Sequence, residues 1–210
     1  MGGAVAVEES TAEVILAAIQ DRRSIGRVSD EAPPRALIER ILEAGRWAPS
    51  HHLTEPWRFF VLQGDARVAL GAVMGELASA GIADTEERRA AYDRAAGKPL
   101  RAPYVIVVAV EPAEAANVFE VEEIASVAAA AQNMLLAAHA LGLAAMWRTG
   151  AVCYEPAIRR YFGLSDRATV LGFVYVGYAA MPTPVRERRA LSEVVIWLDG
   201  AAVPDKCAGA

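Results

Sequence analysis

The chain has very little cysteine. Its 210 residues include only Cys153 and Cys207, which lie in unrelated sequence contexts. No Cys-x-x-Cys pair and no metal-ligand spacing is present, so the simplest interpretation is a protein of the reducing cytoplasm. The first nine residues contain no basic region before an apolar run, which argues against a signal peptide.

Basic residues are outnumbered. The chain has 21 Lys and Arg against 26 Asp and Glu, and its formal net charge is -5. A sequence-independent nucleic-acid binder needs clustered Lys and Arg, and an anionic membrane surface attracts basic segments, so we expect neither partner. The most apolar window, residues 124–147, is rich in alanine and contains Gln132, Asn133 and His139. This composition favours a buried helix over a membrane span.

The common motifs of nucleotide sites and hydrolases are also missing. The sequence has no Gly-x-Gly-x-x-Gly after a strand, no Walker loop, no nucleophile elbow and no His-Glu-x-x-His. His51 and His52 are adjacent, so they point in different directions and make a poor metal pair. From the residues alone, a loop-capping role and a ligand-contacting role for this pair are equal alternatives.

The apolar pattern that is present predicts one domain with helices and short strands. Residues 104–110 are apolar on both faces and predict a central strand. A long alanine-rich helix is expected near residues 122–141, where Gly142 would end it. The remaining expected strands are 59–62, 144–147 and 169–178, and the remaining expected helices follow Ser10, Pro34, Asp65 and Glu155. Residues 80–100 are charged and helix-prone, which suggests an exposed helix or a lid.

Four polar clusters follow or precede these elements. Two are dominated by arginine and suit a phosphate, because guanidinium is a forked donor for oxyanions. The other two combine rings, hydroxyls and backbone donors, which suits a flat heteroaromatic ring. The clusters are Arg22-Arg23-Ser24, Ser50-His51, Trp147-Arg148-Thr149-Gly150 and residues 186–189. A phosphorylated cofactor with a large ring fits them, and flavin mononucleotide (FMN) is the obvious member of that class. For the first cluster, a solvated helix end is the alternative.

These clusters occur together with other motifs in the order found in the nitroreductase family of flavin enzymes, which the chain resembles from about residue 12 to residue 198. Within that family it looks like the branch of NAD(P)H nitroreductases with smaller chains. The matching segments are Arg22-Arg23-Ser24, Ala44 to His51, Pro56-Trp57-Arg58-Phe59, Ala102-Pro103, Ala129 to Gly142, Trp147 to Gly150, Leu171-Gly172-Phe173 and Arg188 to Leu191. Residues 1–10 would be an N-terminal extension, residues 11–200 the FMN-binding domain and residues 201–210 a C-terminal tail.

The resemblance implies an α+β fold with a central, mostly antiparallel sheet flanked by helices. It also implies an intertwined homodimer with FMN at the subunit interface. Arg22, Arg23 and Ser24 would hold the FMN phosphate, together with two arginines of the tail. We assign those two as Arg186 and Arg188, although an alignment slip of one residue would bring in Arg189. The apolar run from Val194 to Trp197 would need a sheet edge or a partner subunit to cover it.

The resemblance also assigns the ring contacts. Trp147, Arg148, Thr149 and Gly150 would line the isoalloxazine ring. Trp47, Ser50 and His51 would contact the FMN from the other subunit, and His52 would be a bystander. A guanidinium such as Arg27 or Arg148 would stabilise negative charge on the reduced ring. The resemblance implies no catalytic side chain in the strict sense and no metal.

One residue departs from the family pattern. Glu55 stands where the family often has glutamine, and an ionised carboxylate accepts hydrogen bonds but does not donate them. Either Glu55 turns away to an arginine, or it alters the reduction potential of the flavin.

The expected function is electron transfer from NAD(P)H, as co-substrate, through FMN to a nitroaromatic, quinone or similar small acceptor, in ping-pong order. The alternatives are a flavin-binding protein without nicotinamide turnover, a family member that carries out dehalogenation or ene reduction, and a binding module without flavin.

Overall fold

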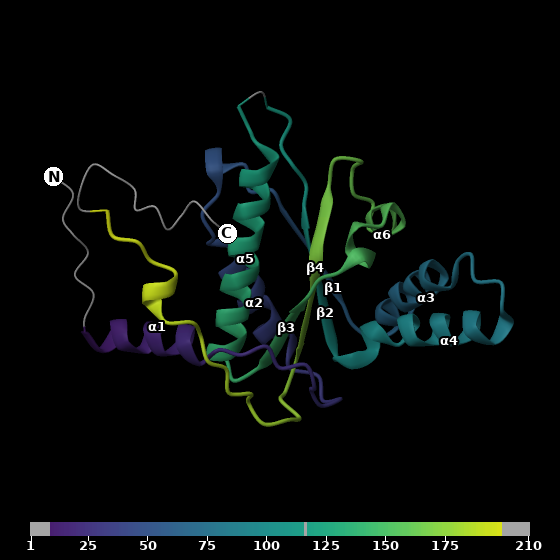
Figure 1. The fold of residues 1–210 in the computed structure, drawn as a ribbon, viewed down its shortest axis with the longest axis horizontal. Coiled ribbons are helices and arrows are strands. Elements are labelled where there is room, and N and C mark those ends of the chain that lie inside the picture. The colour runs from purple at the N-terminus through teal and green to yellow at the C-terminus, as the bar shows by residue number, and fades with distance from the viewer. Residues whose placement is uncertain (1–8, 116, 199–210) are drawn as a thin grey trace.

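An antiparallel sheet of four strands forms the centre of the structure, a computed structural model that describes residues 9–115 and 117–198 (Figure 1). The strands are β1 (Trp57–Leu62), β2 (Tyr104–Val110), β3 (Ala144–Arg148) and β4 (Thr169–Gly177), in the order β1-β2-β4-β3. Each neighbouring pair is antiparallel. The α+β prediction is therefore confirmed. The predicted tail, residues 201–210 with Cys207, lies outside the described residues, as does most of the predicted N-terminal extension.

The inner strands β2 and β4 are more deeply buried than the edge strands β1 and β3. Every residue of β2 is buried, which confirms the prediction of a central strand at 104–110. The prediction of a buried strand at 59–62 is only partly right, because β1 is an edge strand and Val61 is 42% exposed. A strand with one neighbour and one covered face keeps part of its apolar surface in solvent.

Helices cover both faces of the sheet. Figure 1 shows α2 and α5 on one face and α3, α4 and α6 on the other. The helices are α1 (Glu9–Asp21), α2 (Arg35–Arg46), α3 (Asp65–Ser79), α4 (Thr85–Ala96), α5 (Glu120–Ala140) and α6 (Pro156–Tyr161). Short 3₁₀ turns occupy His51–Leu53, Lys98–Arg101, Ala151–Tyr154 and Leu191–Glu193. The sheet thus separates two apolar cores, one on each face.

The alanine-rich helix α5 packs closely on the sheet and on α2, as its small residues permit. Ala130 and Ala131 are fully buried, and a Cβ atom added to Gly45 of α2 would lie 3.0 Å from Met134. The helix stops just before Gly142, whose φ of 73° is a conformation that glycine adopts without strain. The predicted helix and its predicted end are confirmed.

The charged segment 80–100 contains helix α4, which lies against α3. A Cβ on Gly71 of α3 would come within 2.3 Å of the Ala96 carbonyl oxygen, and one on Gly75 within 2.7 Å of the Tyr92 ring. The two helices therefore touch through glycine, and α4 is a packed helix. On α3 itself, Gly64 and not Asp65 occupies the N-cap position. Val68 of α3 is apolar, but it is 54% exposed.

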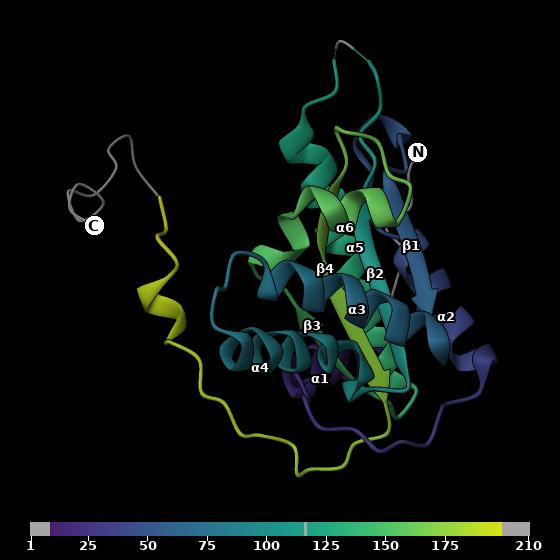
Figure 2. The same cartoon turned by 90° about the vertical axis from the view of Figure 1, so that its right-hand side faces the viewer.

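Two apolar surfaces remain uncovered in the single chain. On α1, Val14, Ile15, Leu16 and Ile19 are each about half exposed or more. The segment that follows β4 is largely extended, and its later part lies apart from the sheet and its helices, as the yellow ribbon in Figure 2 shows. Trp197 in that segment is 80% exposed. Apolar surface of this kind usually marks a contact with another molecule.

Candidate functional site

The first predicted cluster lies beside the edge strand β3. Ser24 forms a parallel bridge with Ala145, and the Ile25 backbone N–H donates to the Ala145 carbonyl at 3.2 Å. The segment after α1 therefore extends the sheet beyond β3. As a result, Arg22 and Arg23 lie beside the beginning of that strand.

Arg22 is surrounded by positive charge. Burial lowers its pKa most, and the charges of Arg23 and of Arg188 from the tail lower it further. The Nε atoms of Arg22 and Arg23 are buried without a hydrogen-bond partner, and within the described residues none of the three arginines forms an ion pair. Three cations, two of which have an unsatisfied buried donor, form a site for an anion.

The second cluster is at the end of β3, next to the first. Gly172 of β4 lies so close that an added Cβ would be 2.4 Å from the Trp147 Nε1 atom. The Arg148 guanidinium lies 5.3 Å from the centre of the Tyr175 ring, and one of its nitrogens would be 3.2 Å from a Cβ on Gly26. Trp147 Nε1 and Arg148 Nε are buried donors without a partner in the described chain. The segment that follows the arginine cluster therefore adjoins the ring cluster at Gly26 and Arg148.

A cavity of about 380 Å³ opens at this second cluster. Trp147, Arg148 and Thr149 line it, as does Tyr175, whose pKa is raised by burial and lowered to a smaller degree by Arg148 and Arg101. The cavity also receives Lys98 and Arg101, which precede β2. The sequence-based prediction missed both residues because they belong to a segment with many charges. The signal that could have found them is their position directly before the central strand.

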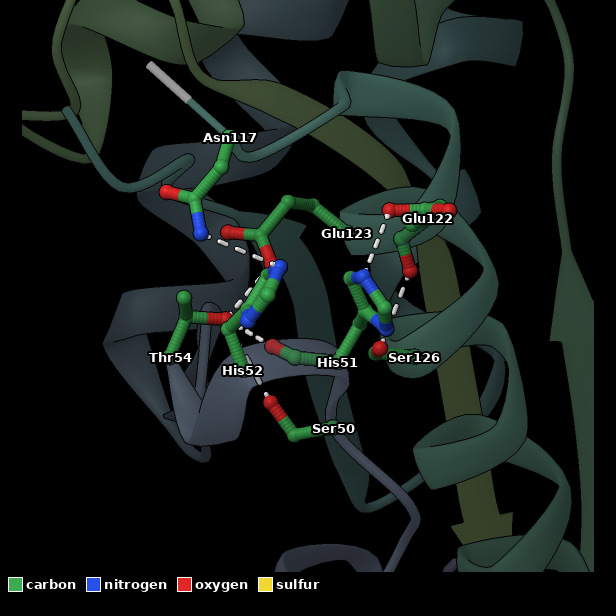
Figure 3. A network of polar contacts seen from close by, with 8 residues as sticks. All are labelled: Ser50, His51, His52, Thr54, Asn117, Glu122, Glu123 and Ser126. Atoms are coloured by element: carbon green, nitrogen blue, oxygen red, sulfur yellow. Dashed lines mark hydrogen bonds and ion pairs between the residues drawn. The ribbon is translucent and has the colours of Figure 1, made fainter. Parts of the chain in front are cut away.

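The third predicted cluster lies elsewhere on the chain. Ser50 and His51 line a cavity of about 430 Å³ together with Glu122 and Ser126 of α5. The His51 Nε2 atom is 3.2 Å from a carboxylate oxygen of Glu122 (Figure 3). None of the residues of the cavity at β3 lines this second cavity.

Trp47 occupies a third position. It is 78% exposed, and its indole N–H donates to Glu43 at 3.0 Å. Its ring lines an apolar groove of about 430 Å³ between α1 and α5. Within one chain, the structure therefore gathers the arginine cluster, Arg188 and the ring cluster, but it does not bring Trp47, Ser50 and His51 to them.

A buried carboxylate supports the loop that carries Ser50 and His51. Glu123 of α5 has no exposed surface, and its oxygens accept from the Thr54 hydroxyl at 2.5 Å and from the Ala113 backbone N–H at 3.1 Å (Figure 3). The Thr54 hydroxyl is also 3.3 Å from Ser50 Oγ. The sequence-based prediction did not single out Glu123.

Glu55 and the tail arginines are exposed. Glu55 has a φ of 47°, its backbone N–H donates to Ser50 Oγ at 2.9 Å, and it has no arginine partner among the described residues. Of the two alternatives for Glu55, an ion pair with arginine is therefore not observed within the described chain. Arg186 and Arg189 are exposed on the tail, so the choice between them remains a prediction.

Residues 9–115 and 117–198 contain no group of three or more His, Cys, Asp or Glu side chains placed to hold a metal ion. None of their helices is long and apolar enough to cross a membrane. The cytoplasmic location stays a prediction.

Comparison with known proteins gives consistent matches. The model of the Nitroreductase family matches residues 19–178. An Escherichia coli (strain K12) protein named Putative NAD(P)H nitroreductase YdjA is 36% identical over 157 residues, which cover 75% of this chain and 84% of the relative.

Solved structures match over nearly the whole chain. A nitroreductase-like family protein from Bacillus cereus is 25% identical, with a TM-score of 0.76, and the match covers 95% of this chain and 100% of that one. A nitroreductase from Bacteroides fragilis NCTC 9343, solved with bound FMN, is 25% identical, with a TM-score of 0.67, and the match covers 92% of this chain and 100% of that one.

Proposed function

This chain belongs to the nitroreductase family, and from that premise we propose that it is an FMN-dependent oxidoreductase that uses NAD(P)H as electron donor and a small organic acceptor. The FMN in the Bacteroides fragilis structure and the NAD(P)H in the name of the Escherichia coli relative support this assignment. Nitroaromatics and quinones are the acceptor classes we propose, with donor and acceptor bound in turn at the same place.

The observation that carries the proposal is the arginine cluster with its unsatisfied donors. Arg22, Arg23 and Arg188 form no ion pair in the described chain, and two of their buried Nε atoms have no acceptor. A dianionic phosphate would supply the missing acceptors and charge. We propose that these arginines and Ser24 hold the FMN phosphate, with Arg186 as the second arginine of the tail.

The adjoining cluster fits the ring. Trp147, Arg148, Thr149 and Gly150 lie at the end of β3, and Lys98 joins them in the 380 Å³ cavity. Bound FMN would supply the redox chemistry that links oxidation of NAD(P)H to reduction of the acceptor. The protein orients the ring and stabilises the negative charge of its reduced form, for which Arg148 and Lys98 are the nearby cations.

The remaining predicted contacts require a second copy of the chain. Trp47, Ser50 and His51 lie outside the cavity at β3, so in one chain they cannot complete the same site. The exposed apolar faces of α1 and of the tail give a homodimer the surface it needs. We propose that one subunit supplies the phosphate and ring clusters and its partner supplies these three residues.

The function is tested by colour and by reduction. The purified full-length protein should be yellow, and its absorption should bleach without oxygen when NADH or NADPH is added. A colourless protein that cannot be reconstituted with FMN would refute the proposal. A yellow protein that nicotinamide does not bleach would instead be a flavin-binding protein without this turnover.

The dimer is tested by placing a charge on α1. Ile15→Asp should give a monomer with weakened FMN binding, because a carboxylate cannot be buried in an apolar interface without a partner. Ala90→Asp on the exposed side of α4 is the control. If light scattering finds the Ile15→Asp protein dimeric and fully loaded with FMN, α1 does not form the interface.

A further inference from the structure

Glu123 is the one carboxylate among the described residues that is entirely withdrawn from solvent. A buried carboxylate is unfavourable unless hydrogen bonds replace its hydration. Its two oxygens receive two such bonds, from the Thr54 hydroxyl and from the Ala113 N–H. Within the described chain no cation pairs with it. Its partners come from two segments outside α5, so Glu123 joins three parts of the fold.

The segment that holds Thr54 has an unusual backbone. His52, Leu53 and Glu55 have φ values of 53°, 55° and 47°, in the left-handed region that residues other than glycine rarely adopt. These are the positive-φ residues other than glycine in the described chain, and all three fall within four positions. Such a conformation persists only where the surrounding structure imposes it.

The hydrogen bonds around Thr54 are placed to impose it. The Thr54 hydroxyl reaches Glu123 on one side and lies near Ser50 Oγ on the other, and Ser50 Oγ accepts from the Glu55 N–H (Figure 3). Glu55 at the end of the segment and Ser50, which precedes the segment, are thereby linked through Thr54 to the buried carboxylate. His52 adds a contact of 3.3 Å between its Nε2 atom and the side-chain amide of Asn117.

The arrangement also decides where His51 lies. The residue precedes the left-handed segment, and its Nε2 atom lies 3.2 Å from Glu122 in the lining of the 430 Å³ cavity that Ser50 also lines. If the segment relaxed to ordinary φ values, the chain direction would change at His52. The side chains of Ser50 and His51 would then leave their present positions.

We propose that Glu123 is a positioning residue that acts through Thr54. It holds residues 50–55 in place, with His52, Leu53 and Glu55 in the left-handed conformation, and so presents Ser50 and His51 to the cofactor of the partner subunit. The importance of these two residues to the cofactor rests on the proposed function. We call the set of hydrogen bonds that links Glu123, Thr54, Ser50 and Glu55 the clamp. The evidence for the clamp consists of these hydrogen bonds and the backbone angles alone.

The first experiment removes the hydroxyl and keeps the shape. Thr54→Val deletes the bond to Glu123, Thr54→Ser retains it, and Thr85→Val at the exposed start of α4 is the matched control. The chain has three histidines, so their ring resonances in the full-length protein can be assigned one by one. Thr54→Val should shift or broaden the resonances of His51 and His52 and leave that of His139 unchanged. Thr54→Ser and Thr85→Val should give the spectrum of the unaltered protein.

The same variants are then titrated with FMN. Thr54→Val should raise the dissociation constant of FMN by about tenfold, which corresponds to the loss of one hydrogen-bonded contact with the cofactor. Thr54→Ser should leave this constant unchanged. Unchanged His51 and His52 resonances in Thr54→Val would overturn the clamp. Altered resonances with unchanged FMN affinity would support the clamp and count against the assignment of Ser50 and His51 to the cofactor.

A rescue variant separates positioning from a general loss of stability. Leu53 is 84% exposed, so Leu53→Gly removes no buried contact but allows the left-handed conformation without strain. Added to Thr54→Val, it should restore the histidine resonances at least in part. If the double variant is no closer to the unaltered spectrum than Thr54→Val, the strained backbone is not what Glu123 holds, and the proposal fails.

Discussion

Replacement of Gly172 by alanine tests how tightly β4 positions the ring cluster. Gly172 has a φ of 148°, and an added Cβ would lie 2.4 Å from Trp147 Nε1 and 2.5 Å from the Arg148 carbonyl oxygen. The sheet is irregular here, since the register of β2 and β4 shifts opposite this residue. Either the Trp147 ring must move or the two strands must separate.

Gly172→Ala should lower the free energy of unfolding through two effects that can be distinguished. The positive φ costs an alanine roughly 1–3 kcal/mol. Overpacking against the indole and the carbonyl adds about 1–3 kcal/mol. Gly163 provides the control, because its φ is 66° and no atom lies within 4 Å of an added Cβ. Gly163→Ala should therefore show a backbone cost without the overpacking, and Gly172→Ala should be the less stable variant by about 1–3 kcal/mol.

Urea unfolding at a fixed protein concentration measures both variants, since stability in an oligomer depends on concentration. Gly172→Ala should also bind FMN more weakly because the displaced Trp147 lines the cavity. Gly163→Ala should bind it normally. If the two variants have equal stabilities and equal FMN affinities, then the close approach of Gly172 to Trp147 does not position the site.

Three further predictions address single charged or ionisable groups. Arg22→Gln should weaken FMN binding by about one to two orders of magnitude in a fluorescence titration, as expected for the loss of a charged hydrogen bond, while Arg89→Gln on α4 should have no effect. Glu55→Gln should retain FMN and shift its reduction potential in a spectroelectrochemical titration; an unchanged potential would mean that Glu55 does not touch the ring. Burial raises the pKa of Cys153 from 9.0 to about 11, so the unfolded chain ionises first and stability should fall between pH 9 and pH 11. Cys153→Ala should lose less stability over that range, by about 3 kcal/mol at most, in urea unfolding at each pH.

The elements that the sequence predicted well are those specified by a local pattern. The apolar run 104–110 is the buried strand β2, and the alanine-rich helix α5 ends where Gly142 was expected to end it. The glycines of β4, Gly172 and Gly177, lie where an added Cβ would meet neighbouring atoms within 3 Å, as is typical of glycine inside a strand. In each case a residue type permits only a few backbone or packing arrangements, so the pattern is informative without knowledge of the rest of the chain.

Burial of a polar residue could not be predicted in the same way. Glu122 and Glu123 are adjacent and chemically identical, yet Glu122 lines a cavity and Glu123 is completely buried. The difference arises because Thr54, 69 positions earlier, meets Glu123 in the folded chain. Val68 illustrates the converse, since an apolar residue at a helical spacing is exposed where no other element covers it.

The distribution of the site over the fold has the same origin. The order of the motifs along the chain predicts that Ser50, His51 and Trp147 belong to one site, but it does not indicate which copy of the chain supplies each residue. In the folded chain Ser50 and His51 face α5, whereas Trp147 faces the cavity at the end of β3. Under the proposed function, the β3 cavity, which Lys98, Arg101 and Arg148 line, is the half-site that needs completion. Since the apolar faces of α1 and the tail are uncovered in one chain, the same association that buries them can supply the missing half. Assembly and cofactor binding should therefore be thermodynamically coupled, so that FMN strengthens the dimer by the same factor by which dimerisation strengthens FMN binding.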